Sequence, residues 1–185
     1  MSIPVSVVML AQNSAGTLDR ALASVRAFDE VVVVDGGSVD ATASIAAAYP
    51  NVVWRVHPFR GFAEQRNFAL RQASHPWCLV LDSDEAATPE LVEGIASRRW
   101  EDAPTSLYYV MRTDWFMGRE LDSGYARSTS HARFFRKARV DYRGHVHESP
   151  FVDGRKPHRD AEWVGTLPAD WRILHRPDND IEDEL

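Results

Sequence analysis

Short continuous apolar runs alternate with helical patterns along the first half of the chain. Each run is rich in Val, Leu or Ile, which is typical of strands covered on both faces of a sheet. Between the runs, apolar residues recur at helical spacing, as at Ile45 and Tyr49. This alternation predicts an α/β fold with a mostly parallel sheet and helices on both faces. The predicted strands are Ile3–Leu10, Val31–Val34, Val52–Val56 and Trp77–Leu81.

The second half of the chain carries shorter apolar segments that lack helices between them. Leu107–Met111 and Ala132–Arg136 are predicted to be strands. Further on, Trp163–Leu167 and Trp171–Leu174 are predicted to form a strand pair with a turn at Pro168. This pattern indicates a smaller, mixed β region on the far side of the sheet.

These two patterns suggest a single domain with two functional halves. Residues 1–103 would form the ligand-binding half, and residues 104–176 would form the half that meets a second substrate. The acidic residues 177–185 are expected to be a flexible tail. A length of 185 residues suffices for one well-buried domain.

Charge and composition narrow the class of protein. The formal net charge of −6 argues against a nucleic-acid-binding surface, which is normally basic. The single cysteine, Cys78, lies within an apolar run, which favours a buried thiol and a reducing compartment. The sequence has no apolar stretch long enough for a transmembrane segment. It also has no signal-peptide pattern. We therefore expect a cytoplasmic protein.

Three carboxylates follow the most apolar strand at once. Asp82, Asp84 and Glu85 come directly after Trp77–Leu81, at the carboxyl end where ligands bind in open α/β sheets. Such crowded negative charge favours a divalent cation, and Mg²⁺ or Mn²⁺ prefers these oxygen ligands. The alternative is an acidic loop that merely ends the strand. The position of the three carboxylates at the carboxyl end of the strand favours the metal site over this alternative.

Polar residues also follow the first two predicted strands. Asn13 follows the first, and the segment Asp35–Asp40 follows the second. Gly36 and Gly37 permit a sharp turn. Either Ser38 or Asp40 would cap the next helix, which leaves Asp35 free of a structural task and available to a nucleoside. Neither the Walker pattern nor Gly-x-Gly-x-x-Gly occurs in this turn.

The predicted helix Gly61–Ala73 carries a cation on its inner side. Phe62 and Ala69 are expected to face the core, and Arg66 lies one turn from Phe62. The long side chain of Arg66 would therefore point towards the sheet. Most arginines reach back to water instead. The carboxylates at the same edge favour a role for Arg66 near phosphates.

The chemical centre of the second half is the segment His145-Val146-His147-Glu148. We expect Glu148 to be a general base, with Asp114 as the second choice. The two histidines could alternatively form part of a zinc site, although structural zinc requires four ligands. Three further side chains that we expect to face the cleft are His131, Arg133 and His175, of which His175 is a candidate third metal ligand.

Three of these segments together resemble family 2 of the inverting glycosyltransferases, which have the GT-A (Rossmann-like) fold. The segments are Val33–Thr42, Gly61–Leu70 and Leu81–Glu85, and Tyr142–Glu148 is similar to the branch of lipopolysaccharide-core glucosyltransferases. Family members usually have an acidic residue beside the early asparagine, whereas Ser14 follows Asn13 in this chain.

The resemblance implies a nucleotide-diphosphate sugar as donor, with uracil as the expected base. By analogy, Asp35 and Asp40 would contact the nucleoside, Arg66 would lie near the diphosphate, and Asp82 with Asp84 would hold the donor and a Mn²⁺ or Mg²⁺ ion. The acceptor would be a glycan or a lipid-linked glycan in cell-envelope or lipopolysaccharide synthesis. For such a role, a peripheral contact of the protein with the inner face of the membrane is also an expectation.

Two other functions remain open from the sequence. A non-catalytic nucleotide-sugar-binding module would keep the donor site without the chemistry. A sugar-1-phosphate nucleotidyltransferase shares a nucleotide-binding α/β core but normally has a basic, Gly-rich loop near its N-terminus. The segment Asn13–Thr17 lacks basic residues, which argues against this second alternative.

Overall fold

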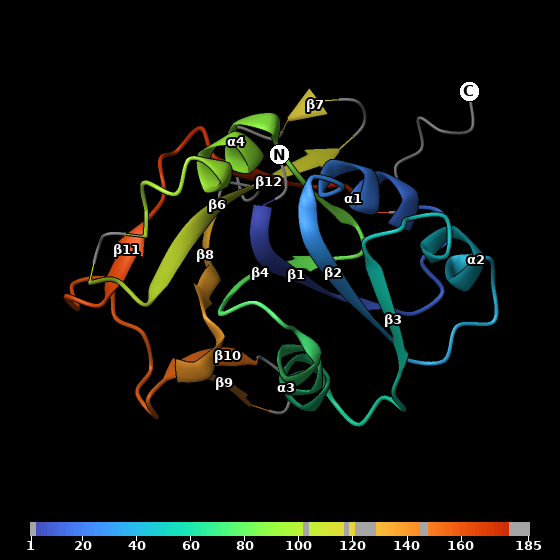
Figure 1. Cartoon of the computed structure of the whole chain (residues 1–185), viewed down its shortest axis with the longest axis horizontal. Helices are drawn as coiled ribbons and strands as arrows, with labels where there is room; N and C mark the ends of the chain where they lie inside the picture. The colour runs from blue at the N-terminus through green and yellow to red at the C-terminus, as the bar shows by residue number, and fades with distance from the viewer. Residues whose placement is uncertain (1–2, 102–103, 117–118, 121–128, 145–147, 178–185) are drawn as a thin grey trace.

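The computed structural model of the chain describes residues 3–101, 104–116, 119–120, 129–144 and 148–177. Within them, ten strands form one curled sheet and two form a separate hairpin (Figure 1). The helices are α1 (Leu18–Ser24), α2 (Thr42–Ala46), α3 (Phe62–Gln72) and α4 (Pro89–Ala96), with a 3₁₀ turn at Lys137–Arg139. The strands are β1 (Ile3–Ala11), β2 (Phe28–Asp35), β3 (Val52–Val56), β4 (Trp77–Asp82), β5 (Glu85–Ala87), β6 (Leu107–Phe116), β7 (Arg119–Glu120), β8 (Thr129–Arg136), β9 (Val140–Arg143), β10 (Ser149–Val152), β11 (Val164–Thr166) and β12 (Arg172–His175).

The sheet has a parallel half and a mixed half. Its order is β3-β2-β1-β4-β8-β6-β12-β5, and β7 and β11 also pair with β6. All pairings among β3, β2, β1 and β4 are parallel. Strand β8 then runs antiparallel to both β4 and β6. The predicted α/β fold, mostly parallel at first and mixed afterwards, is confirmed.

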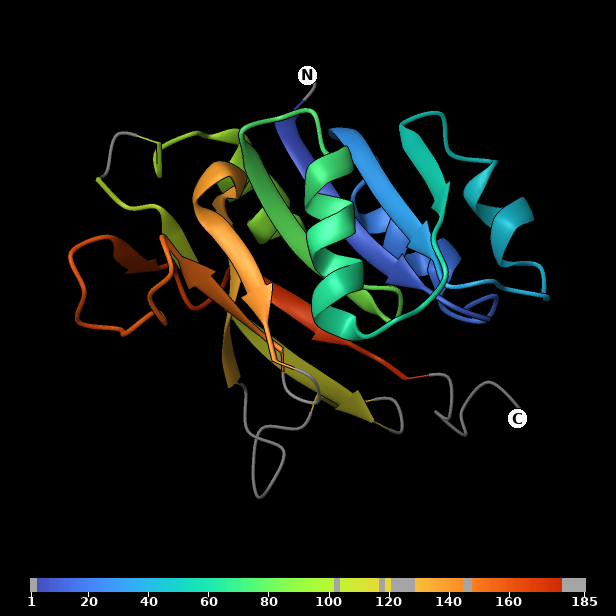
Figure 2. The same cartoon turned by 90° about the horizontal axis from the view of Figure 1, so that it is seen from below.

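Apolar side chains fill both faces of the parallel half, because successive residues of a strand point to opposite sides. On one face, Val7 and Met9 of β1 belong to a core that includes Leu22 of α1 and Leu91 of α4. On the other face, Val8 belongs to a core that includes residues of α3. Figure 2 shows α3 lying across its face of the sheet, with α1 behind the strands and α2 to the side, beyond β3.

Two helix starts that involve threonine differ in their capping. Thr88 accepts a hydrogen bond from the backbone of Leu91, and Pro89 occupies the first turn, as expected for a capped helix. Thr17 precedes α1, but its side chain makes no capping hydrogen bond. On α3, Phe62 was expected in the core, yet it is 49% exposed. Its ring instead packs against the ring of Phe59, with the ring centres 5.0 Å apart.

The predicted pairing of the two late strands is wrong. Strand β11 pairs in parallel with the beginning of β6, and β12 pairs in parallel with its end. Both strands therefore lie along the same edge of β6 instead of forming a hairpin, because β12 also finds an antiparallel partner in β5. No helix among the described residues is long and apolar enough to cross a membrane.

Candidate functional site

A cavity of about 220 Å³ lies at the carboxyl ends of β1, β2 and β4. We call it the strand-end cavity. Its lining includes Gln12 and Gly36 from the loops after β1 and β2, and Asp82 and Asp84 from the end of β4. The parallel arrangement brings these loops to one edge, as the sequence predicted.

Asp82 is held between two arginines. Its Oδ1 lies 2.7 Å from Arg66 Nη2, and its Oδ2 lies 2.9 Å from Arg133 Nη2. Both arginines are buried, at 8% exposure each. Burial alone would raise the pKa of the Asp82 carboxyl, but Arg133 and Arg66 outweigh it and hold that pKa well below its usual range. Asp82 is therefore a fully ionised anchor for two cations.

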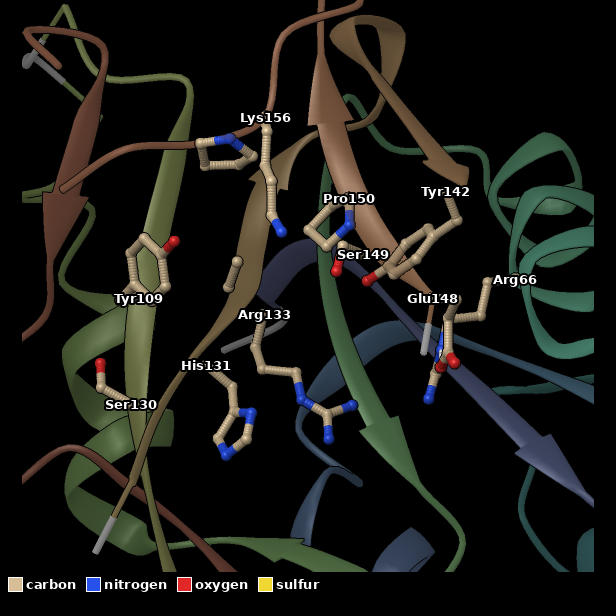
Figure 3. A pocket seen from close by; sticks show the side chains of 12 residues that line it. Arg66, Tyr109, Ser130, His131, Arg133, Tyr142, Glu148, Ser149, Pro150 and Lys156 are labelled. Carbon is tan, nitrogen blue, oxygen red and sulfur yellow. Dashed lines mark hydrogen bonds and ion pairs between the residues drawn. The ribbon is translucent and has the colours of Figure 1, made fainter. Parts of the chain in front are cut away.

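A second cavity of about 260 Å³ lies on the other side of this pair. We call it the β8–β10 cavity, because β8, β10 and the loop after β10 supply most of its lining. Arg66 donates from Nε to Glu148 Oε1 at 3.0 Å, and its guanidinium carbon lies 5.6 Å from the ring centre of Tyr142. Figure 3 shows Arg66, Arg133 and Glu148 around this cavity. Arg66 lines this cavity and Asp82 lines the strand-end cavity, so the ion pair between them forms a wall between the two cavities.

Glu85 supports this arrangement from beneath. Its side chain is fully buried, and it accepts hydrogen bonds from the backbone N–H of Asp82 and from Arg133 Nη2, both at 2.9 Å. Arg112 Nη1 lies 3.7 Å away. Burial raises the pKa of Glu85, against the attraction of Arg133. Since all three of these neighbours present N–H groups to the side chain, the carboxylate form fits the geometry.

Asp84, His175 and Asp114 form a chain of contacts beside the strand-end cavity. His175 Nε2 lies 3.2 Å from Asp84 Oδ2, and His175 Nδ1 lies 2.8 Å from Asp114 Oδ1. The hydrogen bond with Asp84 is the largest cause that raises the pKa of His175, aided by Asp114 and opposed by burial. Asp114 also pairs with Arg112 at 3.2 Å.

This chain of contacts has features of a partial metal site. A carboxylate and an imidazole nitrogen face each other, and a second carboxylate holds the other ring nitrogen, as is usual for metal-binding histidines. No group of three or more His, Cys, Asp or Glu in the described part of the chain could hold a metal by itself. The donor set therefore fits a cation that takes its remaining ligands from a bound phosphate and water.

The loops after β1 and β2 are held together by the predicted polar residues. Asp35 is 3% exposed and accepts hydrogen bonds from the backbones of Gly37 and Ser38 at 3.0 and 2.9 Å. The expectation that Asp35 has no structural task is therefore wrong, because the tight turn directs two N–H groups at its carboxylate. Asp40 accepts from the backbones of Thr42 and Ala15, both at 3.0 Å.

Asn13 completes this loop cluster. Its side-chain oxygen accepts from the backbone of Val39 at 2.9 Å, and its own backbone is left-handed, with φ of 50°. Asparagine tolerates this conformation better than most residues. Asn13, Asp35 and Asp40 are not among the described residues that line the strand-end cavity, but they hold the loops whose other residues do, such as Gln12 and Gly36.

Some lining residues were missed by the sequence analysis. Phe59 and Phe62 line the strand-end cavity, with ring centres 5.0 Å apart in a T-shaped pair, although both are about half exposed. Lys156 lines the β8–β10 cavity. The available signals were two phenylalanines on either side of Gly61 and a basic run near Lys156. The residues His145 and His147 lie outside the described part of the chain.

Comparisons with known proteins agree with this fold. The model of the family "Glycosyl transferase family 2" matches residues 6–156. The lipopolysaccharide core biosynthesis glycosyltransferase LpsC of Rhizobium meliloti is 30% identical over 158 residues, which cover 82% of this chain and 58% of LpsC. The succinoglycan biosynthesis protein ExoO of the same organism is 38% identical over 101 residues, covering 51% of this chain and 29% of ExoO.

A solved structure extends the similarity to most of the chain. The crystal structure of residues 1–349 of S. aureus TarS in complex with UDP-GlcNAc superimposes with a TM-score of 0.66 at 19% identity, covering 94% of this chain and 58% of that one. This likeness supports the predicted GT-A fold. Because the family model matches most of its length, the chain belongs to glycosyl transferase family 2.

Proposed function

We propose that this chain is the catalytic domain of a metal-dependent, inverting glycosyltransferase that moves a sugar from a UDP-sugar to an acceptor hydroxyl. The observation that carries the proposal is the pair of cavities separated by Arg66 and Asp82. Two substrates can then meet at one charged wall. The similarity to LpsC favours a role in lipopolysaccharide or other cell-envelope glycan synthesis.

The strand-end cavity would take the donor nucleotide. The exposed rings of Phe59 and Phe62 offer an apolar surface for a base, and the loops that contain Asn13, Asp35 and Asp40 surround the nucleoside. The TarS structure with UDP-GlcNAc supports UDP as the nucleotide. This assignment keeps the three polar residues as donor-binding residues that also build their own loops.

The diphosphate would lie beside Arg66, at the end of β4. Arg66 is already ionised and in place, so its interaction with developing negative charge needs little rearrangement. Asp84 and His175 would hold a Mn²⁺ or Mg²⁺ ion, and the imidazole favours Mn²⁺. When bound, such an ion stabilises negative charge on the leaving diphosphate. Asp82, committed to Arg66 and Arg133, would act mainly by positioning these two cations.

The acceptor would enter the β8–β10 cavity, where Glu148 is the candidate base. Glu148 lines this cavity, and Arg66 binds one of its two oxygens. The other oxygen can accept the proton of a hydroxyl group as the new bond forms. Among the described residues, Asp114 lines neither cavity and is engaged by Arg112 and His175, so it remains the second choice.

The cellular setting is part of the same proposal. A glycan or lipid-linked acceptor would place the protein in the cytoplasm, with a peripheral contact at the inner face of the membrane. The similarity to LpsC and ExoO, both named for glycan biosynthesis, supports this setting.

Calorimetric titration of UDP, first with Mn²⁺ and then with EDTA, tests the proposal. We expect binding that requires the metal. In Asp84→Asn, the metal-dependent part should weaken at least about tenfold, because one of two protein ligands is impaired. Asp29→Asn removes an exposed charge at the opposite end of β2 and should bind like wild type.

Two results would contradict the proposal. Metal-independent binding that Asp84→Asn leaves intact would disprove the metal site. A folded protein that binds neither UDP nor GDP, CDP or dTDP would disprove the donor site. Binding of UDP-sugars without release of UDP in the presence of any acceptor would instead indicate a nucleotide-sugar-binding module.

A further inference from the structure

The buried charges of the β8–β10 cavity are already matched. Arg66 lies between Asp82 and Glu148, and Arg133 lies between Asp82 and Glu85. Two cations thus face three carboxylates across short distances. Because these carboxylates already balance the two arginines, the arginines do not explain by themselves why this cavity would prefer an anionic ligand.

Lys156 adds a cation that has no such match. It is exposed, it lines the cavity, and it makes no ion pair or hydrogen bond with any described residue. Figure 3 shows its side chain extending from the loop after β10 into the cavity. An ammonium group on a flexible stem that points into a cavity is suited to contact a ligand directly.

Basic side chains cluster around Lys156, and acidic residues lie at either end of the same loop (Asp153, Asp160 and Glu162). Arg155, Lys156, His158 and Arg159 occupy four of five consecutive positions in a chain whose net charge is −6. Arg159 lies with its guanidinium carbon 4.6 Å from the ring centre of Tyr109, which itself lines the cavity. This cation–π contact keeps a second positive charge at the rim.

Neutral hydrogen-bonding groups complete the same wall. Burial, reinforced by the positive charge of Arg133, lowers the pKa of His131 to about 4, so its imidazole is neutral at pH 7. Ser130 Oγ is buried and has no hydrogen-bond partner in the described part of the chain. Both residues line the cavity. They could bind the neutral hydroxyls of a sugar while the cations bind its charge.

We propose that the β8–β10 cavity recognises an acceptor sugar that carries a negatively charged group, a phosphate or a carboxylate, with Lys156 as its direct partner and Arg159 as a second attractive charge. This inference rests on the proposed function, since it names the class of acceptor for that site. Glu148 repels an anion, so the charged group lies towards Lys156 and the accepting hydroxyl lies towards Glu148. The basic segment 155–159 therefore selects both the acceptor and its orientation.

The test measures binding of small probes to the protein saturated with UDP and Mn²⁺, so that the strand-end cavity is occupied. The probes are mannose 6-phosphate, galacturonate and inorganic phosphate, with mannose as the neutral comparison. We expect at least one anionic probe to bind more tightly than mannose. Lys156→Gln should weaken that probe about fivefold, the typical effect of one exposed charge pair, and Lys156→Gln with Arg159→Gln should weaken it further.

The matched control is Arg99→Gln, which removes an exposed positive charge beyond α4, away from the cavity. It should leave the anionic probe unaffected, and all variants should bind UDP like wild type. Equal loss in Arg99→Gln, undiminished binding in Lys156→Gln, or binding of none of the anionic probes would overturn the inference. A membrane contact would also overturn it. In that case no probe would bind, the wild type would bind phosphatidylglycerol vesicles, and only the double variant would lose this binding.

A failure of the proposed function gives a different result. If UDP does not bind, the probe titrations are made on the free protein. The effect of Lys156→Gln then still reports on the anion site, independently of the donor.

Discussion

Replacing Glu85 by glutamine should destabilise the protein strongly, although the two side chains have almost the same shape. The carboxylate is fully buried and accepts one hydrogen bond on each oxygen, from Asp82 N and from Arg133 Nη2. Glutamine offers one acceptor oxygen and one NH₂ group. In either orientation, one buried donor therefore faces another donor.

The magnitude follows from these contacts. A buried donor left unpaired costs about 1–3 kcal/mol, and the hydrogen bond that remains loses the strength that the charge gave it. Together these changes should lower the free energy of unfolding by roughly 2–4 kcal/mol. For a domain of this size, the corresponding fall in Tm is roughly 5–15 °C.

Urea unfolding followed by circular dichroism measures this effect. Glu101→Gln is the control, because Glu101 also pairs with an arginine, Arg98, but in a largely exposed pair. It should change the free energy of unfolding by less than about 1 kcal/mol. An equally small change in Glu85→Gln would refute the reasoning, and would show that Glu85 is a neutral acid in the folded protein, which glutamine can replace.

Three further changes test other parts of the structure. Glu148→Gln should lower turnover by about 10²–10⁴-fold while UDP binding is retained, since the base is lost, and unchanged turnover would remove Glu148 from that role. Gly94→Ala should lower the free energy of unfolding by about 1–3 kcal/mol, because the new Cβ would lie 2.3 Å from the ring of Trp171. Alanine otherwise favours helices, so a variant that is more stable in urea unfolding would contradict this packing. Burial raises the pKa of Glu30, but hydrogen bonds from serine neighbours outweigh it and lower that pKa below its ordinary value of 4.5. The stability that wild type gains over Glu30→Gln should therefore be present above pH 4.5 and disappear as the pH falls through the lowered pKa, and a difference that persists in full at low pH would argue against it.

The first half of the chain could be predicted well because its signals are local. Continuous apolar runs predicted β1 to β4, and helical spacing predicted α2 and α3. The carboxyl ends of parallel strands then placed Asp35, Asp82 and Asp84 at one edge of the sheet. Local pattern also indicated that Arg66 points towards the sheet.

The remaining features depend on contacts between distant parts of the chain. Nothing near Trp163–Leu167 in the sequence indicates that β11 would pair with β6 instead of with β12. Arg133 was expected in the cleft, but its bonds to both Asp82 and Glu85 depend on the register between β4 and β8. The exposure of Phe62 depends on how the first turn of α3 meets the loop that carries Phe59. Pairings and surfaces of this kind are set by the tertiary structure, which composition and spacing do not encode locally.

The pairing of β8 with β4 has a consequence for how the domain can be built and divided. Arg133 contacts a carboxylate that precedes it by 51 residues, and β8 covers the edge of β4. A fragment that ends at residue 103 would expose this edge, which invites aggregation, and would leave its acidic turn without the second arginine. The charged wall thus depends on a contact between residues far apart in the sequence, of the kind that slows folding. The smallest portion that could be exchanged between relatives with its donor site intact must therefore include β8.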